Sequence, residues 1–280
     1  MQLFLNFNGK LLPANSLLIS PDNRSFRYGE GLFETIRFQH GAIPLWNYHW
    51  KRIESSLPQL HFEIPLHFTE SELKQAIAAL VQKNRCTEAA RIRITFFKGD
   101  GGLWEQPSTP FHYLIQCWPL ERKDVSLNEN GLIAGVFESG RKICDRYSNL
   151  KSGNYQLYLL AAQFAKQQKW NEALVLNEYR RICDATIANV FIVTQNQVVT
   201  PQLTEGCVSG VMRSYLLETA KVQGIEVVES KVTIEELLQA DEVFLSNAMG
   251  IRWVKEIENK NYKNNTTVSL FHSVIKPLFV

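Results

Sequence analysis

One stretch decides how the rest of the chain is interpreted: Ser148-Asn149-Leu150-Lys151-Ser152-Gly153-Asn154-Tyr155, which leads into Gln156-Leu157-Tyr158-Leu159-Leu160-Ala161-Ala162-Gln163. A short polar run gives way to apolar side chains at helical spacing, which are Tyr155, Leu159, Ala162 and Ala165. We therefore predict that a buried helix starts here, and that Lys151 lies just before it or in its first turn.

A lysine at that place has a chemical interpretation. The N-terminal end of a helix carries partial positive charge, which disfavours an ammonium group, and desolvation lowers the pKa of a lysine. A neutral amine can attack an aldehyde, so Lys151 is a candidate for covalent chemistry with a carbonyl group. The alternative is a lysine that extends into solvent.

Composition limits the class of protein. The 280 residues are 45% hydrophobic and 21% charged, which is typical of a folded protein with a large core. The net charge is +2, and basic and acidic residues are interspersed, so neither nucleic acid nor a membrane surface is an expected partner. No run reaches the roughly 18 apolar residues that a membrane span needs, and no leader segment is recognisable. We expect a cytoplasmic protein.

Cysteine and histidine spacing argues against a metal site. The five cysteines are far apart and form no CxxC pair, and the six histidines show no HExxH pattern. Reduced, packed thiols and no bound metal are therefore expected. The chain also lacks a P-loop and a dinucleotide glycine fingerprint.

The first part of the chain alternates strands and helices. Asn8-Gly9 predicts a hairpin, a half-buried strand covers residues 32–38, and Asn47 is the predicted N-cap of a helix that stops at Pro58. The other predicted elements are a helix at 70–83 capped by Thr69, and strands at 90–97 and 111–118.

The second part follows a polar segment, which is the predicted linker. Its expected strands are 132–137, 173–176, 190–193, 198–200, 226–228 and 243–245, with a turn at Asn196, and its further helices are 211–223, 234–239 and 268–278. This mixture predicts an α+β protein with an N-terminal domain over 1–118, a linker over 119–129 and a C-terminal domain over 130–280.

Several residues are candidates for holding an anion or a ring. Asp184, expected in a small-residue loop before a buried strand, either caps a turn or faces a protonated heterocyclic nitrogen. The glycine-bounded loop 206–210 runs into a helix start, where the backbone amides of Val211 and Met212 form a possible phosphate site. Arg52 is a second possible phosphate contact, and the turn Ser246-Asn247-Ala248 is a third.

Together these parts resemble a known family. The sequence resembles the class IV aminotransferases, the fold type IV pyridoxal-phosphate enzymes. The resemblance extends nearly from end to end, through Tyr28-Gly29-Glu30-Gly31-Leu32-Phe33-Glu34-Thr35, His49-Trp50-Lys51-Arg52, Leu150-Lys151 with Asn154, Asp184 through Asn189-Val190-Phe191, Gly210-Val211-Met212-Arg213, and Ala240-Asp241-Glu242-Val243-Phe244.

The resemblance implies roles for individual residues. Lys151 would condense with the aldehyde of pyridoxal 5'-phosphate and move the substrate proton, Asp184 would face the pyridine nitrogen, and Tyr155 would reach the ring oxygen. Phosphate contacts would come from the candidates named above. The family usually has Glu at the place of Asp184, and its branched-chain members space the lysine and tyrosine one residue further apart. The resemblance also implies a smaller N-terminal α/β domain, a larger barrel-like C-terminal domain and a homodimer.

Two reactions compete. Ser246-Asn247-Ala248-Met249 is similar to the 4-amino-4-deoxychorismate lyases, which have Asn at the place of Asn247 and make 4-aminobenzoate for folate synthesis. Phe33 stands where D-amino-acid aminotransferases have a tyrosine that binds the substrate carboxylate. In the lyase, the candidates to bind two substrate carboxylates are Arg93, Lys98 and Arg252. The alternatives are branched-chain or D-amino-acid transamination with a 2-oxo acid, and a non-catalytic member of the family.

Overall fold

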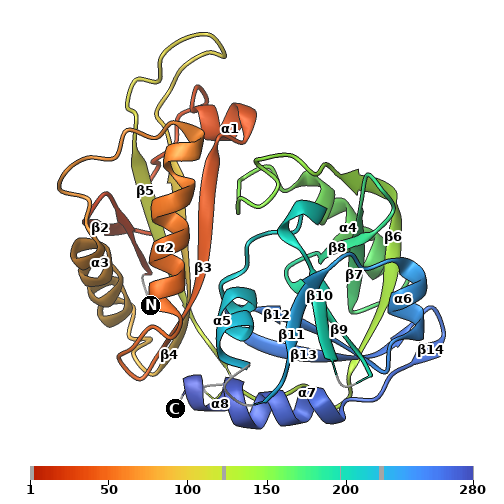
Figure 1. The fold of residues 1–280 in the computed structure, drawn as a ribbon. Coiled ribbons are helices and arrows are strands. Elements are labelled where there is room, and N and C mark those ends of the chain that lie inside the picture. The colour runs from red at the N-terminus through yellow and green to blue at the C-terminus, as the bar shows by residue number, and fades with distance from the viewer. Residues whose placement is uncertain (1–2, 122–123, 196, 221–223, 280) are drawn as a thin grey trace. The chain divides into compact units, whose positions relative to one another are not determined.

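The computed structural model describes residues 3–121, 124–195, 197–220 and 224–279, in two units (Figure 1). The first unit consists of residues 1–123 together with Lys151–Asn154, and the second of residues 124–150 and 155–280. The predicted division at 119–129 is a sequence-based boundary and stays a prediction. The segment with Lys151, which that prediction assigned to the C-terminal domain, is grouped with the first unit.

The first unit is built on a five-stranded antiparallel sheet of order β2-β1-β5-β4-β3. Its strands are β1 (Phe4–Phe7), β2 (Lys10–Pro13), β3 (Gly31–Gln39), β4 (Ala89–Phe97) and β5 (His112–Pro119). The predicted first hairpin is confirmed, because Asn8 and Gly9 take φ values of 50° and 86°, as a tight primed turn requires.

Three helices accompany this sheet: α1 (Arg24–Tyr28), α2 (Trp46–Ser56) and α3 (Glu70–Lys83), with a 3-10 turn at Pro58–Leu60. The α3 prediction is confirmed, and the Thr69 hydroxyl accepts a hydrogen bond from the Glu72 amide. The predicted Asn47 cap is wrong. Leu45 is the N-cap of α2, in a left-handed conformation and without a side-chain hydrogen bond.

Strand β3 confirms the strand predicted over residues 32–38, but it is buried on both faces, so the predicted half-burial is wrong. Helix α2 packs on β3, and Glu34 on that side is 3% exposed. On the other side Phe33 contacts the cationic groups of Arg93 and Lys151. Alternation in the sequence signals one apolar face, and it does not reveal that charged side chains from other segments cover the second face.

The second unit contains a curled nine-stranded sheet of order β11-β10-β9-β12-β13-β6-β7-β8, with β14 paired to β13 (Figure 1). Its strands are β6 (Leu132–Lys142), β7 (Glu172–Asn177), β8 (Ile182–Ala185), β9 (Asn189–Thr194), β10 (Gln197–Pro201), β11 (Val227–Ser230), β12 (Glu242–Asn247), β13 (Gly250–Ile257) and β14 (Lys260–Asn261). The predicted class, α+β with a smaller N-terminal part and a larger barrel-like C-terminal part, is confirmed.

Strand β8 was expected to be a loop. Asp184 lies inside this strand and pairs with Val175 of β7, so the expectation that it lies in a loop before a strand is wrong. The run is four residues long and contains a charged side chain, so it has neither the length nor the alternation by which a strand is recognised.

Helix α4 (Gln156–Gln167) has Tyr155 as its N-cap, so Lys151 lies before the first turn and not within it. The predicted apolar face is partly wrong: Ala165 is buried as predicted, but Leu159 is 59% exposed and Ala162 is exposed too. The buried side chains are Tyr158, Ala161 and Ala165, which face β6 and β7. The macrodipole of α4 decays within one turn and therefore does not account for the environment of Lys151.

The remaining helices are α5 (Val211–Thr219), α6 (Ile234–Gln239), α7 (Asn265–Leu270) and α8 (Lys276–Leu278), with a 3-10 turn at Leu203–Glu205 and a π-helical turn at Phe271–Ile275. The predicted turn at Asn196 and the predicted helix end at Gln223 lie outside the described residues. Within the described ranges, every helix is too short or too polar to cross a membrane.

Candidate functional site

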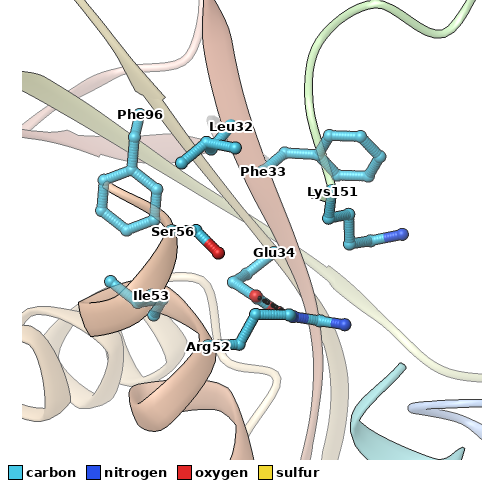
Figure 2. Close-up of a pocket in the computed structure, with 8 residues that line it drawn as sticks. All are labelled: Leu32, Phe33, Glu34, Arg52, Ile53, Ser56, Phe96 and Lys151. Atoms are coloured by element: carbon cyan, nitrogen blue, oxygen red, sulfur yellow. Dashed lines mark hydrogen bonds and ion pairs between the residues drawn. The ribbon is translucent and has the colours of Figure 1, made fainter. Parts of the chain in front are cut away.

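Lys151 is fixed by backbone pairing with the edge of β3. Its carbonyl oxygen accepts a 2.9 Å hydrogen bond from the Phe33 amide, and the Gly153 amide donates to the Gly31 carbonyl at 2.8 Å. The Nζ atom of Lys151 lies 4.4 Å from the centre of the Phe33 ring. Figure 2 shows this lysine entering from a loop beside the strand. Backbone pairing thus places Lys151 beside β3, although the two are more than 100 residues apart in the sequence.

Two glycines permit close backbone contacts around this segment. A Cβ atom at Gly153 would lie 3.0 Å from the Gly29 carbonyl oxygen, so glycine there permits the segment with Lys151 to lie close to the start of β3. A Cβ atom at Gly31 would lie 2.6 Å from the carbonyl oxygen of Phe96 on β4, which is shorter than any side chain tolerates. Glycine at position 31 therefore permits β3 to approach β4.

Arg52 lines the same small pocket as Lys151 (Figure 2). Its Nε and Nη2 atoms donate to the two carboxylate oxygens of Glu34 at 2.7 and 2.6 Å, and the Nδ1 atom of His49 is 2.7 Å from the same carboxylate. Burial opposes the charge of Glu34, yet Arg52 and His49 hold the pKa of this carboxyl at about 2. Burial also lowers the pKa of His49. The pocket therefore contains a permanently charged, bidentate ion pair.

Sequence reasoning missed Glu34 and His49. A signal was present, because Glu34 alternates with Leu32 and Ile36 on an apolar strand face, and His49 and Arg52 are three residues apart on one helix face. A buried carboxylate needs a cationic partner, and this arrangement supplies one.

Of the predicted substrate ligands in this unit, Arg93 contacts the same aromatic ring as Lys151. Its guanidinium carbon is 4.0 Å from the centre of the Phe33 ring that Lys151 also contacts. Lys98 is 7% exposed, and its amine donates to Glu30 at 2.8 Å and to the Leu60 carbonyl at 3.0 Å. Its assignment to substrate stays a prediction.

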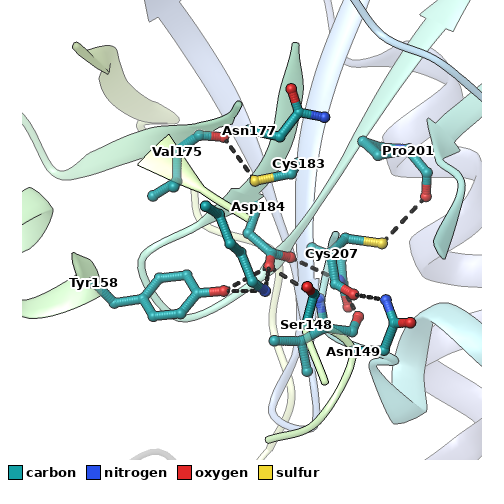
Figure 3. A network of polar contacts seen from close by, with 12 residues as sticks. Ser148, Asn149, Tyr158, Val175, Asn177, Cys183, Asp184, Pro201 and Cys207 are labelled. Carbon is teal, nitrogen blue, oxygen red and sulfur yellow. Dashed lines mark hydrogen bonds and ion pairs between the residues drawn. The ribbon is translucent and has the colours of Figure 1, made fainter. Parts of the chain in front are cut away.

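In the second unit, Asp184 is 2% exposed and accepts four hydrogen bonds within the described residues (Figure 3). Its Oδ2 atom accepts from the Tyr158 hydroxyl at 2.8 Å, from the Lys142 amine at 3.0 Å and from the Val208 amide at 3.0 Å. Its Oδ1 atom accepts from the Asn189 side-chain amide at 3.0 Å. A buried carboxylate is thus held on one oxygen by three donors, with one donor on the other.

Asn189 connects this carboxylate to the start of α5. Its side-chain amide also donates to the Val208 carbonyl at 2.8 Å, and a Cβ atom at Gly210 would lie 1.9 Å from its oxygen. Gly210 is the N-cap of α5 and offers no side chain to the first turn. The Val211 and Met212 side chains are buried, so these residues can present only their backbone amides.

The other candidate residues in this unit differ in whether their polar groups already have hydrogen-bond partners. Ser246 is opposite Asn189 in the β12–β9 pairing, and its buried hydroxyl has no hydrogen-bond partner among the residues that the structure describes. The Asn247 amide donates to the Ile187 carbonyl at 3.2 Å. Arg252 donates to Glu172 at 3.2 Å. Tyr155 donates to the Thr186 carbonyl at 2.8 Å.

Three side chains of the Asp184 network were not among the predicted site residues. Lys142, Tyr158 and Asn189 lie on β6, α4 and β9 respectively. A partial signal existed for Asn189, which lies within the quoted motif that runs from Asp184 to Phe191. Nothing in the local sequence marks Lys142 or Tyr158, because only the β6–β7 and α4 packing brings them to the carboxylate.

Comparison with known proteins identifies the family. Residues 31–257 match the model of the family described as "Amino-transferase class IV". An aminodeoxychorismate lyase of Vibrio harveyi is 31% identical over 240 residues, covering 81% of this chain and 82% of that protein. A putative branched-chain-amino-acid aminotransferase of Methanocaldococcus jannaschii is 29% identical over 266 residues, covering 94% and 90%.

Solved structures share the fold. The branched-chain aminotransferase of Thermoproteus uzoniensis, determined with norvaline, superposes with a TM-score of 0.89 at 23% identity and covers 100% of this chain and 95% of its own. Another branched-chain amino acid aminotransferase, determined with pyridoxamine 5'-phosphate, superposes with a TM-score of 0.87 at 24% identity. The predicted family and its cofactor, pyridoxal phosphate, are confirmed. This protein is a member of the class IV aminotransferase family of pyridoxal-phosphate-dependent enzymes.

Proposed function

We propose that this enzyme is a 4-amino-4-deoxychorismate lyase, which releases pyruvate and leaves 4-aminobenzoate. The observation that carries the proposal is the end of β12, where Asn247 stands at the place of the asparagine of the lyases and Ala248 begins the following turn. The Asn247 side chain closes this turn, because its oxygen accepts from the Met249 amide at 2.9 Å while its nitrogen reaches the Ile187 carbonyl. The likeness to the Vibrio harveyi lyase supports the same assignment.

The donor set of the second unit fits pyridoxal phosphate. The uncapped start of α5 offers backbone amides to a phosphate group, and the Ser246 hydroxyl, which has no partner within the described ranges, is a further donor. Asp184 supplies a buried carboxylate for a protonated ring nitrogen, and its Oδ1 atom accepts only the Asn189 bond among the described residues. Bound there, the cofactor would supply an aldehyde that condenses with amines and a ring that withdraws electrons.

Lys151 and Arg52 are the proposed cofactor contacts of the first unit. Arg52 would hold phosphate, and its ion pair with Glu34 orients the guanidinium. As a free amine, Lys151 would accept the proton from the ring carbon of the substrate that bears the amino group. The bond between the ring carbon and the enolpyruvyl oxygen then breaks, and this oxygen leaves with the electron pair. The leaving group gains a proton to become pyruvate, and aromatisation of the remaining ring makes the step favourable.

Substrate recognition requires cations, because aminodeoxychorismate carries two carboxylates. We assign Arg93 to one of them, since its guanidinium and the Lys151 amine share the Phe33 ring. Arg252 and Lys98 are assigned more weakly, because Glu172 and Glu30 already bind them. The proposal includes a homodimeric, cytoplasmic enzyme of folate synthesis.

Transamination is the second candidate. The likeness to the Methanocaldococcus jannaschii protein, which covers 94% of this chain, favours it. Phe33 argues against a D-amino-acid enzyme, because a phenyl ring cannot donate a hydrogen bond to a carboxylate.

The test is a coupled assay in which purified holoenzyme receives aminodeoxychorismate and lactate dehydrogenase reports pyruvate. We expect stoichiometric pyruvate and 4-aminobenzoate. The Lys151→Ala variant should lose activity by about a thousandfold or more, and Lys51→Ala, which changes an exposed lysine of α2, should not. Turnover of leucine or D-alanine that depends on 2-oxoglutarate, without pyruvate release, would reject the lyase in favour of transamination.

A further inference from the structure

The acid expected to face the cofactor ring already has a cationic partner. The Lys142 amine donates to Asp184 Oδ2 at 3.0 Å and to the Tyr158 hydroxyl at 2.6 Å, and this hydroxyl donates to the same oxygen at 2.8 Å. The side chains of Lys142 and Asp184 are only 12% and 2% exposed. The three groups form a closed, largely desolvated triangle.

The surrounding titratable groups leave Lys142 as the principal countercharge. Burial, and next the charge of Asp184, raises the pKa of Tyr158 well above its ordinary value, so the phenol is neutral. Burial does the same for the Cys183 thiol of β8 and raises the pKa of Cys207 to about 12. The nearby Arg213 guanidinium, on α5, is bound to Glu229.

This arrangement changes the field that Asp184 presents. A lone buried carboxylate strongly favours a proton on a facing heterocyclic nitrogen, whereas a carboxylate in contact with an ammonium group acts as a dipole whose field falls off faster. Two cations sharing one buried anion also repel each other. Lys142 therefore competes with a protonated ring nitrogen for Asp184.

We propose that Lys142 is a positioning residue that neutralises Asp184 and so lowers the preference of the site for a protonated pyridine ring. This inference rests on the proposed function, in which Asp184 faces the ring nitrogen. The proposed reaction also gives a reason for the ion pair between Lys142 and Asp184. A lyase whose product is aromatic gains its driving force from the substrate, so it needs less electron withdrawal from the ring than a transaminase does.

The test is equilibrium binding to cofactor-free enzyme, followed by absorbance, of pyridoxal phosphate and of its analogue with carbon in place of the ring nitrogen. Both carry the same aldehyde and phosphate, so their affinity ratio reports the ring nitrogen alone. We expect Lys142→Met to raise the preference for pyridoxal phosphate about tenfold, which corresponds to a change of about one pKa unit in the ring nitrogen. Lys142→Gln, which keeps a hydrogen-bond donor, should do the same. Asp184→Asn should abolish the preference.

Lys166→Met is the matched control, because Lys166 is an exposed lysine on α4, and its ratio should equal that of the unmodified enzyme. A purely structural role for Lys142 would weaken binding of both compounds equally and leave the ratio unchanged, which would overturn the inference. A ratio that falls would overturn it too. This test measures binding and no turnover. The inference about Lys142 can therefore fail while pyruvate release is observed, and it can hold while pyruvate release is absent.

Discussion

Glu34 shows what a single buried charge does in this molecule. Its carboxylate is 3% exposed, accepts hydrogen bonds from Arg52 and lies 2.7 Å from His49. Desolvation alone would neutralise it, but the guanidinium and the imidazole reverse the shift and hold its pKa at about 2. The orientation of Arg52, and so its capacity to bind an anion, depends on this carboxylate remaining ionised.

A pH dependence of stability follows. Because the pKa of Glu34 is lower in the folded state than its ordinary value of 4.5, its contribution is complete above about pH 4.5 and is lost as the pH falls toward 2. We expect about 3 kcal/mol of unfolding free energy to disappear across that window. Glu34→Gln should be destabilised at pH 7, and its difference from the unmodified protein should shrink in acid.

Urea denaturation at pH 3 and pH 7, followed by tryptophan fluorescence, measures this. Glu63→Gln, at an exposed position, serves as the control and should follow the unmodified protein at both pH values. Parallel loss of stability in the unmodified protein and Glu34→Gln would show that Glu34 does not supply the pH dependence.

At the scale of elements, the start of α5 is both a tightly packed position and the predicted phosphate site. Gly210 has an ordinary φ of −72°, so no backbone strain demands glycine there. The demand is steric, because the Asn189 side chain occupies the place of a Cβ atom. Asn189 in turn holds Asp184 and the Val208 carbonyl. One glycine therefore links the predicted phosphate site to the predicted ring contact.

We expect Gly210→Ala to weaken binding of pyridoxal phosphate by on the order of tenfold, equivalent to about 1.4 kcal/mol. The methyl group must displace Asn189 and shift the first turn of α5. Titration of cofactor-free enzyme by fluorescence measures the affinity, with Gln163→Ala as control, because Gln163 is an exposed residue of α4. Equal affinities in both variants would contradict this account of α5.

At the scale of the whole molecule, chain order and spatial grouping differ. Residues Lys151–Asn154 are grouped with the first unit although the residues on either side of them belong to the second. They extend the edge of β3 through a bridge between Leu32 and Ser152. The edge strand β3 is thereby covered, and the same pairing sets the position of the Lys151 backbone.

Breaking that pairing should move Lys151 without unfolding the protein. Gly153→Pro removes the amide that donates to Gly31 and crowds the Gly29 carbonyl. We expect at least about a tenfold loss of cofactor trapped on Lys151 by borohydride, read by mass spectrometry, because covalent reaction depends on position. The melting temperature should fall by only about 2–4 °C, as for the loss of about 1 kcal/mol.

Ser152→Ala keeps the backbone amides and should trap cofactor normally. Normal trapping in Gly153→Pro would show that the β3 edge does not position Lys151.

Two confirmed predictions depend on local chemistry, although the Asn47 cap, which is equally local, was wrong. Helix α3 and the first hairpin depend on neighbouring residues, namely the Thr69 cap and the Asn8-Gly9 turn, and both are confirmed. The burial of β3, the strand containing Asp184 and part of the apolar face of α4 were predicted wrongly. Each depends on which distant segment packs against the element, and a short or evenly mixed pattern does not encode that.

The sequence by itself determined the family and the cofactor and supplied the candidates for the reactive groups, because ordered motifs preserve the chemistry of individual side chains. Only the tertiary structure decided the partners of those groups: Glu34 for Arg52, the β3 edge for Lys151, and Lys142 for Asp184. The physical reason is that the strength of a charge depends on its burial and its neighbours, and folding brings both from distant parts of the chain.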